Sequence, residues 1–444
     1  MCFFAILFYR VYIPLNSSNN ALIRVEVSLD PVTLSIIAGA GAVGFYMAWS
    51  IGANDVANSM ATSVGSKAIT FKQAVIIAAT LNICGAIFVG SKVADTVKGK
   101  IILEKIATAA DPTVMILGFL AALLAAAIWV TLSTWKEMPI STTHSVVGAL
   151  VGFGLIQWGA HSINWSQLGF VASSWVLSPV VGCIIAFFVF KLIVKLIFAK
   201  EEPVHSAKIV GPFIIGATAF LIAIALLEGT QLSKMFGIDE NYLIIISIAV
   251  IVLIVVTVIS LFLLRKIQAT GLEDYKTVER VFGKLQIITA CYMAFSHGAN
   301  DVANAIGPVA GIVGIANEGV VGITAEVPMW LLAVGGVGIA IGCMTWGRRV
   351  MRTVGEKITS LTHTRGFSVE FAAATTVLTA SKLGMPVSTS HTVVGAVIGV
   401  GLARGLDAID TSVIKKIVIS WLLTVPVAAA TAAVIFICLR TIVG

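Results

Sequence analysis

Carboxylate and amide side chains recur in two copies of the motif Gly-Ala-Asn-Asp-Val-Ala-Asn, at residues 52–58 and 298–304. Each copy lies at the end of an apolar run, so its aspartate is expected at membrane depth, where a carboxylate costs about 2.5–3.5 kcal/mol. The spacing puts the aspartate and the last asparagine one helical turn apart. Carboxylate and amide oxygens suit hard cations such as Na⁺. The predicted sodium ligands are Asp55, Asn58, Asp301 and Asn304.

A glycine opens each motif, and we expect Gly52 and Gly298 to break their helices and free backbone carbonyls for an ion. The alternative is that the Asn and Asp side chains only hydrogen bond neighbouring helices together. Duplication of the full pattern exceeds what packing requires, so we favour the ion-binding interpretation.

Hydroxyl side chains recur in a second duplicated motif, Pro-x-Ser-Thr-x-His, at residues 139–144 and 386–391. Proline in a first turn and Ser or Thr at a cap predict a helix start inside the membrane, where free N–H groups attract an anion. The short apolar stretch Phe371–Ser381 before the second copy predicts a re-entrant hairpin. The alternative is that Ser and Thr satisfy backbone near a proline. The candidate anion-binding hydroxyls are Ser141, Thr142, Thr143, Ser388, Thr389 and Ser390.

Histidines occupy one matched position in these motifs, His144 and His391. We expect them to be structural, with proton coupling or an anion contact as the less favoured alternative. No role is assigned to the unmatched histidines, which are His161, His205, His297 and His363, and Glu228 is expected in a loop.

The four motif copies contain no Lys or Arg. An unaccompanied phosphate, with a charge of about −1 to −2, would meet two carboxylates in a low dielectric, and such repulsion is prohibitive. Two bound Na⁺ would cancel the carboxylates. Binding of an anion here therefore predicts cation coupling, without identifying the anion.

The chain must position these motifs through an internal duplication. Residues 46–58 and 292–304 are identical at eleven of thirteen positions, and residues 138–149 and 385–396 at nine of twelve. The offsets, 246 and 247, nearly agree. We predict an N-terminal segment of uncertain role (1–30), a first membrane repeat (31–199), two linker spans with a cytoplasmic connection (200–279) and a second repeat (280–444).

Composition sets the class of protein. Hydrophobic residues make up 58% of the chain, charged residues 11%, and the mean hydropathy is +1.01. Long continuous apolar runs predict an all-α, polytopic integral membrane protein rather than a barrel, with about 10–12 membrane segments. The net charge of +7 comes from residues dispersed at span ends, so we exclude nucleic-acid binding. The spans are Pro31–Trp49, Gln73–Gly90, Thr113–Ser133, Leu168–Leu192, Ile209–Leu227, Leu243–Leu264 and Ile417–Leu439.

Loop charges favour opposite orientations of the two repeats. Loop 60–72 carries two lysines and no acid, whereas its counterpart 317–328 carries two glutamates and no base. Cytoplasmic loops accumulate Lys and Arg. We therefore predict inverted-topology repeats with broken helices, and a cytoplasmic location for 191–208 and 265–284. Transporters of this architecture bind substrate near the midplane.

The paired motifs resemble those of the inorganic phosphate transporter (PiT) family, which includes sodium- and proton-coupled phosphate carriers, and the resemblance covers most of 31–440. It implies re-entrant hairpins, a homodimer, sodium at the Asp and Asn side chains and phosphate at the Ser/Thr stretches. Asn54 and Asn300 would support either site. Ile51 opposite His297 departs from the repeat symmetry, and the linker is short.

The sequence thus predicts a sodium-coupled phosphate symporter of the plasma membrane, with Na⁺ as coupling ion and no cofactor or catalytic residue. Proton-coupled phosphate or sulfate transport by the same architecture is the main alternative. An aquaporin-like channel needs no buried carboxylate pair. An intramembrane acid–base enzyme would leave the Pro-x-Ser-Thr motifs without a role.

Overall fold

A computed structural model describes residues 11–12, 24–25, 31–238, 241–265, 274–318, 327–351, 362–405 and 411–443. Strands β1 (Val11–Tyr12) and β2 (Arg24–Val25) pair antiparallel, and the rest of the described chain is almost entirely helical. Most of the predicted N-terminal segment 1–30 lies outside the described residues. The first-repeat helices are α2 (Pro31–Gly65), α3 (Phe71–Val89), α4 (Ser91–Gly99), α5 (Glu104–Ala109), α6 (Pro112–Trp135), α7 (Thr142–Trp158), η1 (Ala160–Ser162), α8 (Trp165–Ile193) and the π-helix η2 (Val194–Phe198).

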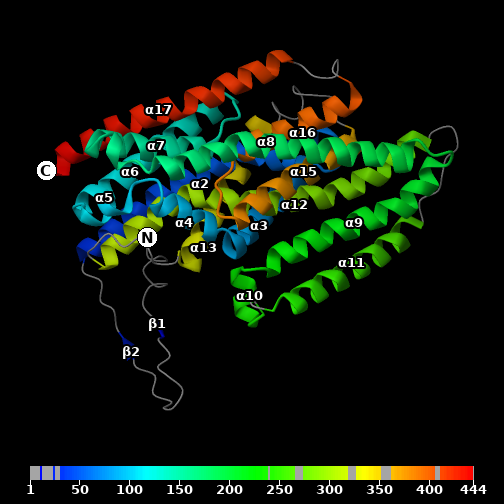
Figure 1. Ribbon diagram of the computed structural model, residues 1–444, viewed down its shortest axis with the longest axis horizontal. Coiled ribbons are helices and arrows are strands. Elements are labelled where there is room, and N and C mark those ends of the chain that lie inside the picture. The colour runs from blue at the N-terminus through cyan, green and yellow to red at the C-terminus, as the bar shows by residue number, and fades with distance from the viewer. Residues whose placement is uncertain are drawn as a thin grey trace.

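The remaining helices belong to the linker and the second repeat. They are α9 (Pro203–Leu227), α10 (Gln231–Phe236), α11 (Tyr242–Arg265), α12 (Asp274–Glu318), α13 (Met329–Thr345), α15 (His363–Lys382), α16 (Thr389–Arg404) and α17 (Thr411–Val443). The long helices run roughly along the longest axis, with α9 and α11 side by side at one edge (Figure 1). Eight of the described helices are long and apolar enough to cross a membrane, and α13 is a shorter apolar helix. The predicted all-α membrane class is confirmed.

Two segments between the predicted spans are partly helical. Helix α2 continues to Gly65, into the loop expected at 60–72, and α4 and α5 occupy much of 92–111, a segment that lies outside the predicted spans. Apolar side chains explain α4, because Val93 and Val97 are buried on one of its faces.

The expected helix breaks at Gly52 and Gly298 are wrong, because α2 and α12 run unbroken through both positions. These glycines instead permit close helix packing. A Cβ on Gly52 would lie 1.9 Å from the carbonyl oxygen of Ile339 in α13, and one on Gly298 would lie 2.2 Å from that of Asn82 in α3. Each acidic motif therefore lies within a continuous helix whose backbone is in close contact with the backbone of a neighbouring helix.

The two halves exchange helix partners. The acidic helix of the first repeat, α2, packs against α13, and its counterpart α12 packs against α3. Likewise α7 packs against α17, and α16 packs against α8. Glycines again make room: an added Cβ on Gly152 would meet the Ala429 carbonyl oxygen at 2.2 Å, and one on Gly399 the Cys183 carbonyl oxygen at 2.1 Å. Neither half builds its own core alone.

Chain interruptions occur at the two Pro-x-Ser-Thr motifs. Helices α6 and α7 form one hairpin, and α15 and α16 form the other, with a helix starting directly after Ser141 or Ser388. Each serine caps its helix, since its Oγ accepts a hydrogen bond from the backbone N–H three residues on, at 3.2 Å and 3.3 Å. The predicted helix starts are confirmed. The prolines, however, precede the cap by two residues instead of standing in the first turn.

Glu228 lies, as expected, outside the helices, in the turn directly after the last residue of α9. Its carboxylate pairs with the Lys382 ammonium at 3.0 Å, and the same Nζ donates to the Ile224 carbonyl oxygen at 3.2 Å. This pair fastens the end of α15 to the linker helix.

Candidate functional site

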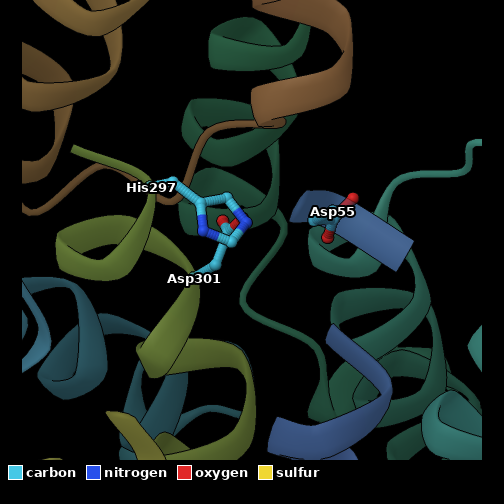
Figure 2. Close-up of side chains that lie close together, drawn as sticks. All are labelled: Asp55, His297 and Asp301. Carbon is cyan, nitrogen blue, oxygen red and sulfur yellow. The ribbon is translucent and has the colours of Figure 1, made fainter. Parts of the chain in front are cut away.

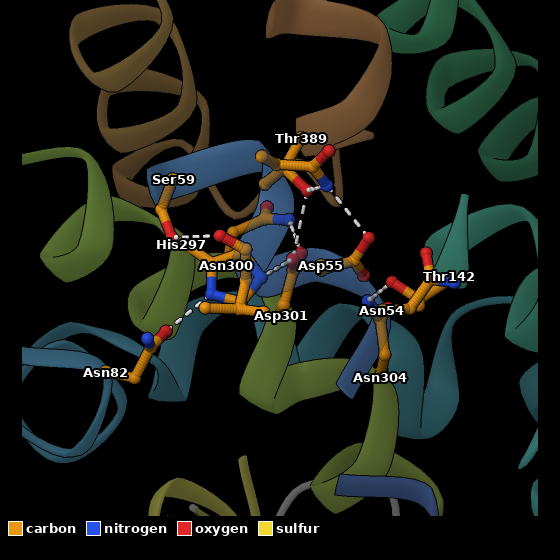
Figure 3. A network of polar contacts seen from close by, with 12 residues as sticks. Asn54, Asp55, Ser59, Asn82, Thr142, His297, Asn300, Asp301, Asn304 and Thr389 are labelled. Carbon is orange, nitrogen blue, oxygen red and sulfur yellow. Dashed lines mark hydrogen bonds and ion pairs between the residues drawn. The ribbon is translucent and has the colours of Figure 1, made fainter. Parts of the chain in front are cut away.

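All four motif copies converge in the interior of the molecule. The middle turns of α2 and α12 meet the starts of α7 and α16, and Figure 3 shows their side chains turned toward one another. Every predicted site residue is at most 5% exposed: Asn54, Asp55, Asn58, Ser141, Thr142, Thr143, Asn300, Asp301, Asn304, Ser388, Thr389 and Ser390. The structure thus brings the predicted sodium and phosphate residues into one cluster.

Asn58 of the first repeat reaches the hydroxyl motif of the second. Its Nδ2 donates to Ser390 Oγ at 2.9 Å and to Thr389 Oγ1 at 3.2 Å. The same amide donates to Asp55 Oδ1 at 2.8 Å, one turn back along α2. We call α7 and α16, the helices that begin directly after Ser141 and Ser388, the half-helices. Asn58 therefore connects Asp55, in its own repeat, to the half-helix of the other repeat.

Asn304 makes the reciprocal link from the second repeat to the first. Its Nδ2 donates to Thr143 Oγ1 at 3.1 Å and to Thr142 Oγ1 at 3.4 Å. Its Oδ1 is buried and has no hydrogen-bond partner among the described residues. An unsatisfied buried carbonyl oxygen of this kind is an acceptor that a cation or a water would complete.

The other two amides hold the chain just ahead of each half-helix. Asn54 donates to the Met138 carbonyl oxygen at 3.1 Å and accepts from the Ile140 N–H at 3.3 Å. Asn300 donates to the Val387 carbonyl oxygen at 2.8 Å and accepts from the N–H of that residue at 3.3 Å. Both side chains hold in place the backbone directly before a Ser/Thr stretch. Neither asparagine is itself part of that stretch.

Hydroxyl groups of the motifs also cross between the repeats. Thr143 Oγ1 donates to the Val387 carbonyl oxygen at 3.0 Å, and Ser390 Oγ lies 3.1 Å from the Ile140 carbonyl oxygen. These bonds hold the two half-helix starts against each other.

Two carboxylates face each other at the centre of the cluster. Oxygen atoms of Asp55 and Asp301 and a ring nitrogen of His297 all lie within 4.8 Å of one another, and Figure 2 shows Asp55 facing the other two side chains from the opposite helix. Thr389 Oγ1 donates to Asp301 Oδ2 at 3.1 Å, whereas Asp55 Oδ2 has no hydrogen-bond partner among the described residues. Two close, buried carboxylates need a cation or a proton between them.

His297, to which the sequence analysis gave no role, belongs to this centre. Its Nε2 lies 2.9 Å from Asp301 Oδ2, and its Nδ1 lies 2.5 Å from Asn82 Oδ1 on α3. The signal that could have found it is the i, i+4 spacing from Asp301 within a helix. The repeat symmetry hid this role, because Ile51 occupies the matching position.

Glu370 is a second buried acid that the sequence analysis missed. Its carboxylate accepts hydrogen bonds from Ser63 Oγ at 2.6 Å, from Thr289 Oγ1 at 2.8 Å and from Thr62 Oγ1. These donors come from α2 and α12, so Glu370 of α15 joins both acidic helices. Its signal in the sequence is a lone carboxylate within an apolar stretch.

The matched histidines lie behind the half-helix starts in an aromatic cluster. The rings of His144 and His391 meet edge to face at 4.4 Å between centroids. Trp175 lies 3.8 Å from the first ring, and Trp421 stacks on the second at 3.5 Å. Tryptophan and histidine alternate across the repeat interface, an arrangement consistent with the expected structural role.

A comparison with known families finds a match to the phosphate transporter family over residues 51–432. The chain belongs to the phosphate transporter family. It is 48% identical to a candidate phosphate permease of Thermococcus kodakarensis over 415 residues, which cover 92% of this chain and 98% of that relative. It is 42% identical to inorganic phosphate transporter 2-1 of Arabidopsis thaliana, a chloroplastic protein, over 88% of this chain and 70% of the relative.

A solved structure resembles the whole fold of this phosphate transporter family member. It is described as the sodium-dependent phosphate transporter, and it matches with a TM-score of 0.86 and 45% identity over 92% of this chain and 100% of that one. The predicted family is therefore confirmed, and the protein is a multi-pass membrane transporter of phosphate rather than an enzyme.

Proposed function

We propose that the protein is a symporter that moves inorganic phosphate together with Na⁺ through the site where the four motifs meet. The observation that supports this proposal is the reciprocal geometry of that site. Two carboxylates within 4.8 Å of each other lie beside two helix starts that carry hydroxyl donors. Carboxylates so close to an anion site would repel the anion, so the anion can bind there only when cations bind with it.

Sodium would bind at the acidic turns of α2 and α12. The acceptors that lack hydrogen bonds among the described residues, Asp55 Oδ2 and Asn304 Oδ1, suit a hard cation. We assign Asp55, Asn58, Asp301 and Asn304 as the sodium ligands, and the sodium-dependent protein with the similar structure agrees with this coupling ion.

Phosphate would bind at the starts of α7 and α16. Free N–H groups of a helix's first turn and about half a positive charge stabilise an oxyanion there. The hydroxyls of Ser141, Thr142, Thr143, Ser388, Thr389 and Ser390 would donate to its oxygens. The amides of Asn54 and Asn300 would act indirectly, because they hold the preceding backbone.

The whole protein would work as two inverted repeats, 31–199 and 280–444, joined by the linker 200–279. The exchanged helix pairs α2–α13 and α12–α3 support a twofold relationship between the halves. Alternating access would then move helices around a fixed central site. We further propose that the protein forms a homodimer in the plasma membrane. Segments 191–208, from the end of α8 to the start of α9, and 274–284, at the start of α12, would lie in the cytoplasm.

Phosphate uptake into proteoliposomes tests the proposal. A sodium gradient should accelerate uptake of labelled phosphate, a potassium gradient of equal size should not, and excess sulfate should not compete. Asp301→Asn should remove most of the sodium dependence. The control Asp111→Asn changes an aspartate that only caps α6. Phosphate uptake that is independent of sodium but is abolished by a protonophore would reject sodium coupling. Inhibition of phosphate uptake by sulfate would reject phosphate specificity.

A further inference from the structure

A hollow of about 350 Å³ lies away from the central site, where the end of α8 meets the beginnings of α12 and α15. Its lining residues are Phe198, Tyr275, Lys276, Glu279, Arg280 and His363. None of them belongs to the four motifs. By the distribution of Lys and Arg, this is the end of the molecule that we place in the cytoplasm.

An aromatic wall closes one side of the hollow. The rings of Phe198 and Tyr275 stack with 5.7 Å between centroids and 15° between planes. Phe198 is held there by the π-helix Val194–Phe198, in which the chain widens at the end of α8. Such π-turns are rare and often occur at functional sites, and tyrosine is enriched at the level of lipid headgroups.

Positive charge faces this aromatic wall. Lys276 and Arg280 lie one turn apart on α12, and both are solvent-exposed. The one acid in the lining, Glu279, already accepts a hydrogen bond from the Thr364 N–H at 3.0 Å, at the start of α15. Two basic side chains against this one carboxylate leave the lining with an excess of positive charge.

A fixed imidazole completes the lining. The His363 ring packs over Gly283 of α12, where three ring atoms lie 3.4 Å from the position that a Cβ would occupy. Its Nδ1 is buried and has no hydrogen-bond partner among the described residues. The ring therefore forms a fixed part of the lining of the hollow.

We propose that this hollow binds a phosphate group, carried either by the headgroup of an anionic phospholipid or by free inorganic phosphate. Arg280 would contact two phosphate oxygens with its planar guanidinium, and Lys276 would add a point charge. Basic pockets between membrane helices on the cytoplasmic side bind such headgroups. The aromatic wall would pack against the glycerol backbone of a lipid.

Two binding measurements on the purified full-length protein test the proposal and separate the two sources. In the first, native mass spectrometry compares phosphatidylglycerol with phosphatidylcholine added to delipidated protein. In the second, equilibrium dialysis with labelled inorganic phosphate, in lipid-free detergent and saturating sodium, counts bound equivalents. Both use Arg280→Gln, Lys276→Gln and the control Lys284→Gln, which changes an exposed lysine on α12 outside the lining.

If the hollow binds a lipid, the protein should prefer phosphatidylglycerol to phosphatidylcholine. Phosphatidylglycerol should bind about tenfold more weakly to the Arg280 variant, because a charge-assisted hydrogen bond is lost. Its binding to the Lys284 variant should be unchanged. A soluble source predicts one phosphate equivalent that disappears in the Arg280 variant while the equivalent of the central site remains. Equal binding of both lipids, together with no phosphate equivalent sensitive to Arg280, would overturn the proposal. Neither measurement depends on sodium-coupled uptake.

Discussion

Asn58 and Asn304 each connect motifs that lie far apart in the sequence. Each side chain donates to hydroxyls at the start of the other repeat's half-helix. A hydrogen bond of this kind between neutral groups contributes about 0.5–1.5 kcal/mol. The two asparagines therefore contribute both to the proposed ion site and to the arrangement of the proposed anion site.

Asn58→Ala should reduce phosphate uptake at least about tenfold, because it removes the donor to Asp55 and to Ser390. Initial uptake rates in proteoliposomes at fixed sodium measure the effect. Asn164→Ala is the matched control, since this asparagine caps α8 far from the site. Equal rates in the two variants would contradict a role for Asn58.

Replacement of His297 by Ile copies the residue of the first repeat. We expect His297→Ile to lower both the melting temperature and the uptake rate, because Asp301 and Asn82 each lose a buried partner. His297→Gln restores a polar side chain and should recover part of both. Thermal unfolding in detergent and uptake are the measurements, and an isoleucine variant as stable and as active as the parent would refute the argument.

Residue types alone predicted the duplicated site, because two copies of each motif exposed its members. The comparison of the two repeats did not reveal His297 or Glu370, because neither has a matched copy. His297 depends on an i, i+4 contact, and Glu370 depends on helices that meet only in three dimensions. A functional residue that occurs in only one repeat cannot be found by comparing the two repeats.

Helix packing explains the glycines of the acidic motifs. Gly298→Ala should destabilise the protein, because its methyl group would lie 2.2 Å from the carbonyl oxygen of Asn82. The control Gly39→Ala in α2 has nothing within 4 Å of the new methyl group, so it should be neutral or slightly stabilising. Yield and melting temperature in detergent measure both variants. Two identical melting temperatures would show that the close contact is dispensable.

Glu370 connects three helices through hydrogen bonds. Glu370→Ala would remove the acceptor from three buried hydroxyls, and we expect a melting temperature lower by a few degrees. Glu370→Gln keeps the shape and one acceptor oxygen and should lose less. The order parent, glutamine variant, alanine variant is the expected result of a thermal melt, and an alanine variant as stable as the parent would contradict it.

Apolar runs predicted the membrane helices but not where the helices would break. The helix starts at Ser141 and Ser388 followed from cap chemistry, which is local. The breaks assigned to Gly52 and Gly298 were wrong because glycine serves two purposes, and the sequence does not reveal whether a neighbouring backbone lies against it.

Orientation of the whole molecule can be tested from its two ends. Helix α5 lies at one end of the long axis, and the end of α8 lies at the other (Figure 1). In a cysteine-free background, Lys105→Cys should react with an impermeant maleimide on intact cells, and Lys200→Cys should react only after permeabilisation. Labelling of both from the same side would reject the proposed orientation.

The reciprocal contacts of Asn58 and Asn304 also bear on how such a molecule could have arisen. A gene that encoded a single repeat would have made one acidic turn and one half-helix, without the hydroxyls of a second repeat that Asn58 and Asn304 reach. With the inverted arrangement we propose, a working ancestor would have needed two copies of that short chain, inserted in opposite directions and paired. Gene fusion would then have fixed in one polypeptide a partnership that already existed between two.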